Sequence, residues 1–148
     1  FAAIPYKLDG SGATVAQIVD EIFELIEQAT VPLIAEQKKE LDELEARVSL
    51  TGERGSGRKA LQDRHKRQLR KFNTDELRSG LSTVAGTYHS LIVSETQYSD
   101  ETKYHDAIHR IHKAMGSLGL NVNEELLLHS LFLHCPSLMM LSRVAAVN

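Results

Sequence analysis

Apolar residues recur at intervals of three and four along most of the chain, and this spacing restricts the fold more than any other feature of the sequence. The most regular run comprises Leu77, Leu81, Val84, Tyr88, Leu91 and Ile92. Residues spaced in this way share one face of an α-helix. Alternation of apolar and polar residues, which marks a half-buried strand, extends over no useful length of the chain. The sequence therefore predicts an all-α fold, a bundle of five to six helices.

The distribution of proline and glycine divides the chain of 148 residues into three parts. Residues 1–13 have no apolar periodicity and contain Pro5 and two glycines, so we interpret them as a linker from an upstream domain. Residues 14–135 are expected to form one helical bundle domain, since a chain of this length can bury one sizeable core. Residues 136–148 are an apolar tail that we expect to pack on the bundle or on a partner.

Several helix boundaries are expected inside the bundle. Pro32 lacks an amide hydrogen and crowds the preceding turn, so it predicts a kink or a new helix at that point. Three glycines between Thr51 and Arg58 predict a loop. Asn73 or Thr74 is expected to cap the start of a further helix, because such side chains accept hydrogen bonds from the first helical amides.

The end of the chain is unusually apolar. The last strong helix is expected to begin at Asn121 or Asn123, and it carries leucines in nearly every direction, which is typical of a helix that is buried on all sides. The tail that follows holds more apolar side chains than a small monomer easily covers. The tail residues that we expect to meet another chain are Leu138, Met139, Met140 and Leu141.

Charge is strongly segregated, although the net charge is only −3. Between residues 54 and 71 eight lysines and arginines accompany one acid, whereas between residues 20 and 45 nine acids accompany two lysines. The basic stretch could contact nucleic-acid phosphates, or it could pack near the acidic stretch of the same chain. The residues in question are Arg64, Lys66, Arg67, Arg70 and Lys71. We favour a solvated or intrachain role, because only Phe72 lies nearby as a platform for bases.

Three histidines, His105, His109 and His112, share one helical face that points away from the apolar stripe of the same helix. A zinc site would need a further ligand and an H-E-x-x-H type arrangement, which the sequence lacks. We therefore interpret the three as exposed or partner-facing side chains, and we expect no bound metal or cofactor. His129 and His134 are interpreted as core residues.

No constellation of side chains supports catalysis. The single cysteine, Cys135, follows a helix C-terminus in apolar surroundings, where the helix dipole disfavours a thiolate. The glycine-rich loop is not a phosphate-binding loop, because Arg58 stands where the lysine belongs and Ala60 supplies no hydroxyl. A lone cysteine gives no sign of an oxidising compartment, and the sequence contains no signal or membrane-spanning segment. We expect a non-catalytic, cytoplasmic protein.

Three stretches show a resemblance to a known family. Residues 64–81 (RHKRQLRKFNTDELRSGL) form a basic run that leads into a central helix. Residues 87–93 (TYHSLIV) combine tyrosine, a polar pair and apolar residues, and residues 107–131 contain AIHRIHKAM and LNVNEELLLHSL. These motifs resemble the C-terminal collar domain of the delta-prime subunit of the bacterial DNA polymerase III clamp loader, in its actinobacterial form.

The resemblance implies an oligomerisation domain that packs beside the equivalent domains of the gamma/tau and delta subunits and helps to hold the loader ring together for DNA replication. The ATP-binding motifs, the zinc module and the arginine finger of the family do not occur in this sequence, so the resemblance implies no ATP hydrolysis here. Two alternatives stay open. One is the equivalent collar of the gamma/tau subunit, and the other is an independent basic helical module that binds DNA phosphates.

Overall fold

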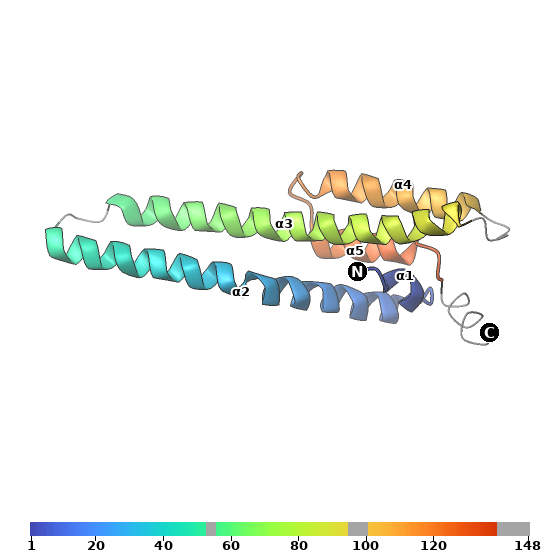
Figure 1. The fold of residues 1–148 in the computed structure, drawn as a ribbon, viewed down its shortest axis with the longest axis horizontal. Helices are drawn as coiled ribbons and strands as arrows, with labels where there is room; N and C mark the ends of the chain where they lie inside the picture. The colour runs from blue at the N-terminus through green and yellow to red at the C-terminus, as the bar shows by residue number, and fades with distance from the viewer. Residues whose placement is uncertain (53–55, 95–100, 139–148) are drawn as a thin grey trace. The chain divides into compact units, whose positions relative to one another are not determined.

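The fold is known from a computed structural model that describes residues 1–52, 56–94 and 101–138 (Figure 1). Within these ranges all regular structure is α-helical, which confirms the all-α prediction. The helices are α1 (Ile4–Lys7), α2 (Gly12–Thr51), α3 (Ser56–Val93), α4 (Glu101–Ser117) and α5 (Glu124–Leu133). None of the described helices combines the length and the apolar character needed to cross a membrane.

The chain forms two compact units instead of the single bundle expected over residues 14–135. The first unit, which we call the terminal unit, consists of Phe1–Phe23 and Leu77–Asn148. The second unit, which we call the hairpin unit, consists of Glu24–Glu76. Both borders fall inside helices, one in α2 and one in α3. No loop or glycine-rich linker marks either border, so neither was predictable from composition.

The terminal unit holds most of the buried apolar side chains. Its core is formed by the first turns of α2, the second half of α3, and α4 and α5, which pack against each other. The core side chains include Val15, Ile18, Val19, Ile22, Leu77, Leu81, Val84, Tyr88, Ile111, Leu128, Leu131 and Phe132. The periodic runs of the sequence thus mark the residues that are buried here, as expected for amphipathic helices around one core.

Residues 1–13 are not a linker, contrary to the interpretation from the sequence. Ile4 and Leu8, four residues apart, are both buried, and Pro5 occupies the first turn of α1. Proline suits that position because the first helical amides have no intrahelical acceptor. The carbonyl oxygen of Pro5 also accepts a 2.7 Å hydrogen bond from the amide of Leu138. The start of the described chain is therefore part of the terminal core.

The hairpin unit consists of the later part of α2 and the first part of α3, which lie side by side in antiparallel directions (Figure 1). Its few buried side chains include Ile26, Thr30 and His65. The seam between the helices is otherwise lined by half-buried apolar residues such as Leu44 and Leu69. A pair of helices has no third layer to cover this seam.

No new helix begins at either of two expected positions in the hairpin unit, because both helices continue through them. α2 runs past Pro32 without a break, and the Thr30 hydroxyl donates a 2.7 Å hydrogen bond to the carbonyl of Glu27 one turn before it. α3 likewise runs past Asn73 and Thr74, so neither caps a new helix. Packing against the neighbouring helix outweighs these local signals, including the cost of roughly 3 kcal/mol for a proline inside a helix.

The helix α5 begins where one of the two expected caps lies. The Asn123 side chain accepts a 2.9 Å hydrogen bond from the amide of Leu126. The helix is not buried on all sides, however. Leu128, Leu131 and Phe132 are buried, whereas the side chain of Leu126 is 66% exposed and that of Leu133 is 45% exposed. The expectation was wrong because a helix that is apolar all round does not reveal which faces the fold covers.

Candidate functional site

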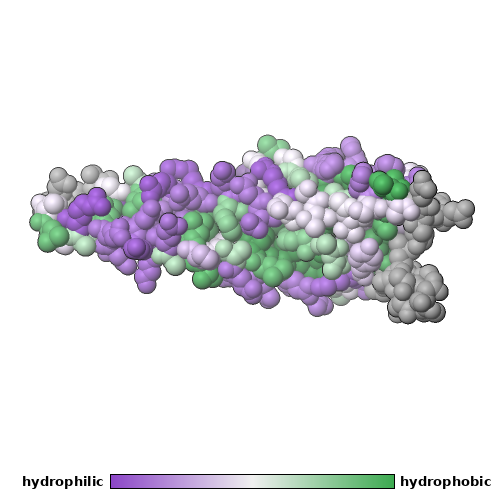
Figure 2. Space-filling model, viewed as in Figure 1, coloured by the Kyte–Doolittle hydropathy of each residue, from purple (hydrophilic) through white to green (hydrophobic). Residues whose placement is uncertain are grey.

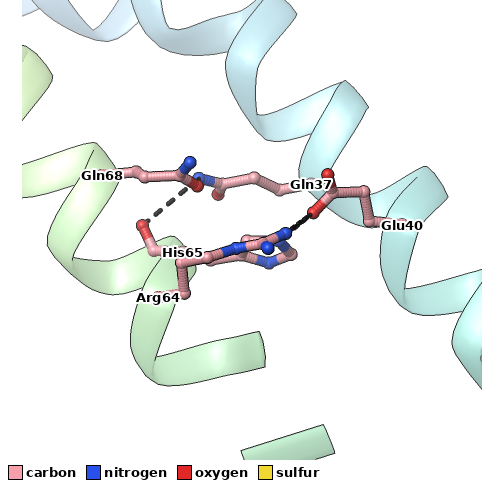
Figure 3. Close-up of polar contacts among 5 residues, drawn as sticks. All are labelled: Gln37, Glu40, Arg64, His65 and Gln68. Carbon is pink, nitrogen blue, oxygen red and sulfur yellow. Dashed lines mark hydrogen bonds and ion pairs between the residues drawn. The ribbon is translucent and has the colours of Figure 1, made fainter. Parts of the chain in front are cut away.

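The acidic and basic stretches of the sequence meet in the hairpin unit, in a cluster of five polar side chains (Figure 3). The Arg64 guanidinium donates a 2.5 Å hydrogen bond to Oε2 of Glu40, and the same oxygen lies 2.7 Å from Nε2 of His65. The Gln37 amide donates to the carbonyl of His65 at 3.2 Å and to Oε1 of Gln68 at 3.4 Å. His65 is only 6% exposed. One carboxylate of α2 therefore holds two neighbouring side chains of α3.

A second ion pair lies nearer the end of the hairpin, where Arg58 is 3.0 Å from Glu45. Together with the Glu40 contacts, it shows that the basic stretch packs against the acidic stretch of the same chain, as the intrachain interpretation predicted. Each exposed pair is worth only about 0–1 kcal/mol. The pairs therefore fix the register of the two helices more than they stabilise them.

Acidification is expected to weaken the hairpin unit. Hydrogen bonds from His65 and Arg64 hold the pKa of Glu40 below its usual value of 4.5. A lowered pKa in the folded state stabilises the fold above pH 4.5, and this contribution is lost as the pH falls through the folded pKa. We expect the thermal midpoint of the wild type to drop on acidification, and the Glu40→Gln variant to lose part of that pH dependence. Circular dichroism melts over a pH series measure both.

The matched control for this experiment is Glu43→Gln. Glu43 is an exposed carboxylate of the same helix, and its nearest cation, Lys39, lies 3.9 Å away. Its removal should leave the pH dependence of the wild type unchanged. Equal flattening in the two variants would contradict a specific role for Glu40.

The remaining basic candidates, Lys66, Arg67, Arg70 and Lys71, are exposed on α3. On a helix they lie away from the side that carries the buried His65, because the residues of that side recur three and four positions apart. Figure 2 shows that hydrophilic side chains cover much of the visible face of this unit. Arg64 is separated from these four by its contact with Glu40. All five predicted cations are exposed, and Arg64 is the one whose carboxylate partner is identified as Glu40.

The predicted interface of the tail is wrong for the one residue that the structure describes. Leu138 is fully buried. Its amide donates a hydrogen bond to the carbonyl of Pro5 in α1, and the neighbouring Ser137 hydroxyl donates to the carbonyl of Leu8. Met139, Met140 and Leu141 lie outside the described residues. The tail as far as Leu138 therefore packs on the terminal unit, which is one of the two alternatives expected for it.

The structure shows an apolar surface that the sequence analysis missed. Leu126 and Leu133 are seven residues apart on α5, so they share one face of that helix. Leu120 and Val122, in the turn before α5, are 76% and 37% exposed. We call these four residues the leucine surface. Sequence alone could not single it out, because the same stretch supplies the core leucines.

The histidines occupy two kinds of environment. His105, His109 and His112 are exposed on α4, as predicted. His129 is half-buried and His134 is exposed with its Nδ1 2.7 Å from the carbonyl of Ser130, so His134 is not the core residue that was expected. Among the described residues, no group of three or more His, Cys, Asp or Glu side chains is placed to hold a metal ion.

Cys135 lies in a nearly closed environment beside Tyr88, with 8% of its surface exposed. The Tyr88 hydroxyl donates a 2.7 Å hydrogen bond to the carbonyl of Pro136, and its ring stacks on that of Tyr104 with centroids 6.0 Å apart. Burial raises the pKa of the Cys135 thiol to about 11, although Tyr88 and the Arg110 guanidinium act in the opposite direction. Burial also raises the pKa of Tyr88. Neither group is prepared for nucleophilic chemistry at neutral pH.

Comparison of the chain with protein-family models, with curated proteins and with solved structures gives no match. A helical fold alone carries no function, so the function has to be argued from the surfaces described above.

Proposed function

We propose that this chain is a non-catalytic assembly module, the collar domain of a clamp-loader subunit of the delta-prime type. The observation that carries the proposal is the leucine surface, which a monomer leaves in contact with water. Leu120, Val122 and Leu126 fall within residues 107–131, one of the three stretches that resemble the collar. Leu133 follows two residues later.

The partners under this proposal are the collar domains of the gamma/tau and delta subunits, and the place of action is the cytoplasm, where a replicative clamp loader works. A stable interface needs roughly 800 Å² from each partner. The leucine surface would form the apolar centre of such an interface, with polar helix residues around it. The equivalent collar of the gamma/tau subunit is the nearest alternative identity.

The DNA-binding alternative has less support. Two of the cations in the basic stretch, Arg58 and Arg64, are paired with Glu45 and Glu40, so their charge is partly neutralised within the hairpin unit. Lys66 and Arg67 are exposed and could contact phosphate. Titration of labelled duplex DNA at two salt concentrations separates the alternatives: sub-micromolar binding that weakens steeply with salt would favour the DNA module.

Co-purification with the gamma/tau and delta collars tests the assembly proposal. We expect the wild-type chain to co-elute with them and the double variant Leu126→Asp with Leu133→Asp to bind at least about tenfold more weakly, because a buried unpaired carboxylate is costly. The control is Leu50→Asp, which introduces one aspartate, half the added charge of the double variant, at an 87% exposed position of the hairpin unit. Circular dichroism checks that each variant remains helical.

Two results would overturn the proposal. One is the absence of any co-elution of the wild-type chain with either collar. The other is a double variant that binds as well as Leu50→Asp.

A further inference from the structure

A groove runs between α4 and α5 in the terminal unit. One part of it, of about 210 Å³, has a floor of Ala114, Leu127 and Leu131, and its rim carries Arg110, Lys113 and His134. An adjoining hollow of about 270 Å³ shares Arg110 and His134 with the first part. The two parts are therefore neighbours along the helix pair, with Arg110 and His134 in the wall of both.

The rim of the groove is cationic. Arg110 and Lys113 are exposed on α4, and the adjoining hollow adds Lys103, with Asp106 as the one acid among the residues that line either part. These four residues recur at intervals of three and four, so they share one face of α4. The formal charge along the groove is therefore +2 with His134 neutral.

His134 adds a directed polar group to the rim. Its Nδ1 lies 2.7 Å from the carbonyl of Ser130, an acceptor, so this nitrogen carries the hydrogen. The contact orients the ring and makes Nε2 of the neutral ring an acceptor, so the attraction for an anion comes from Arg110 and Lys113. The floor, in contrast, consists of side-chain carbon from both helices. A ligand that suits this groove thus combines apolar groups with negative charge.

The groove also adjoins the leucine surface. Leu133 of the leucine surface lines the second hollow and is 45% exposed. An exposed apolar side chain of α5 therefore stands directly beside the groove. Such a combination of a groove, a neighbouring apolar stripe and a cationic rim is typical of surfaces that accept an amphipathic helix.

We propose that the groove between α4 and α5 binds an acidic amphipathic helix of a partner protein, with its apolar side chains on Leu127 and Leu131 and its carboxylates against Arg110 and Lys113. The proposal rests on the proposed assembly function, because it names the chemistry of a partner surface. The positive charges of Arg110 and Lys113 argue for acidic residues on the partner helix. The leucine floor argues against a nucleic acid, which presents phosphate along its whole length.

Peptide binding to the intact chain tests the proposal. The probe is a fluorescent synthetic helix of about 16 residues, long enough to be helical, with leucines at intervals of three and four and glutamates beside them. We expect saturable binding by anisotropy, and a loss of about tenfold in affinity when Arg110→Gln and Lys113→Gln are combined. Replacement of the glutamates of the probe by glutamine should weaken binding to a similar degree, and replacement of its leucines by serine should abolish it.

The matched control is the pair Lys66→Gln and Arg67→Gln, which removes one lysine and one arginine from the exposed side of α3. This variant should bind the probe as the wild type does. Equal losses in the two double variants would show non-specific attraction and overturn the proposal, as would the absence of saturable binding.

Two further experiments test for other ligands of the groove. A duplex oligonucleotide that displaces the probe and depends on Arg110 and Lys113 would overturn the proposal in favour of nucleic acid. Concentration-dependent self-association in sedimentation, abolished by the Arg110 and Lys113 changes, would assign the groove to a second copy of the chain and overturn it as well. If the probe binds but the chain does not co-elute with the collars, the groove proposal stands and the collar function is wrong. If the chain co-elutes but the probe does not bind, the collar function stands and the groove proposal is wrong.

Discussion

Replacement of Tyr88 by alanine is expected to lower the free energy of unfolding of the terminal unit by about 3–5 kcal/mol, the range found for large aromatic side chains in cores. Tyr88 is fully buried, and its removal leaves a cavity beside Tyr104 and an unpaired carbonyl at Pro136. Native-state hydrogen exchange of the Leu131 and Phe132 amides is the suitable measurement. It reports on the terminal unit directly, whereas a melt of the whole chain follows both units together.

Two variants control this prediction. Tyr88→Phe keeps the ring and removes only the hydroxyl, so it should cost about 1 kcal/mol, the usual net value of one hydrogen bond. Tyr6→Ala removes a tyrosine that is 37% exposed and should cost far less than Tyr88→Ala. A Tyr88→Ala variant within about 1 kcal/mol of the wild type would mean that the ring is not the centre of this core.

Cys135 should react with iodoacetamide about 100-fold more slowly in the folded protein than in the unfolded chain. The thiolate is the reactive form, and a rise of the Cys135 pKa from 9.0 to about 11 reduces its fraction at neutral pH by about two powers of ten. The thiol is also only 8% exposed, which slows the reagent further. Mass spectrometry of timed samples, with and without urea, measures the ratio.

The Tyr88→Ala variant gives an internal check on the cysteine, because it opens the cavity beside the thiol and should raise the alkylation rate. Tyr6→Ala should leave the rate unchanged. A folded wild type that is alkylated within tenfold of the unfolded rate would contradict the closed environment described for Cys135.

The features that were predictable from the sequence depend on local periodicity. The stripe from Leu77 to Tyr88 is buried as its spacing indicates, and Asn123 caps α5 because short polar side chains bond to helix amides wherever they precede a helix. The exposure of His105 follows from the same geometry, since it lies away from the apolar stripe of α4.

The features that were not predictable depend on contacts between residues far apart in sequence. Pro32 does not break α2, and Leu138 is buried by α1, which lies more than a hundred residues earlier in the chain. The leucine surface was missed for a related reason. In a segment with leucine on every side, only the position of the neighbouring helices decides that Leu128 is covered and Leu126 is not.

The candidate cations combine a feature that was predictable from the sequence with one that was not. Their segregation from the acids is plain in the sequence, and it correctly suggested an intrachain partner. The particular pairs, Glu40 with Arg64 and Glu45 with Arg58, required the register of the two helices, which no local pattern supplies. The rim of the α4–α5 groove likewise joins Arg110 to His134 only through the fold.

The terminal unit combines the beginning of the described chain with its end, and this has a consequence during synthesis on the ribosome. The core around its first helical turns, with Val15, Ile18 and Val19, is complete only after residues up to Leu138 have been translated. At about 5–20 residues per second, that delay is roughly 6–23 s. The hairpin unit is continuous in sequence and can close while translation proceeds. The apolar side chains at the start of α2 therefore wait several seconds for their last core partners while the hairpin unit can already be closed.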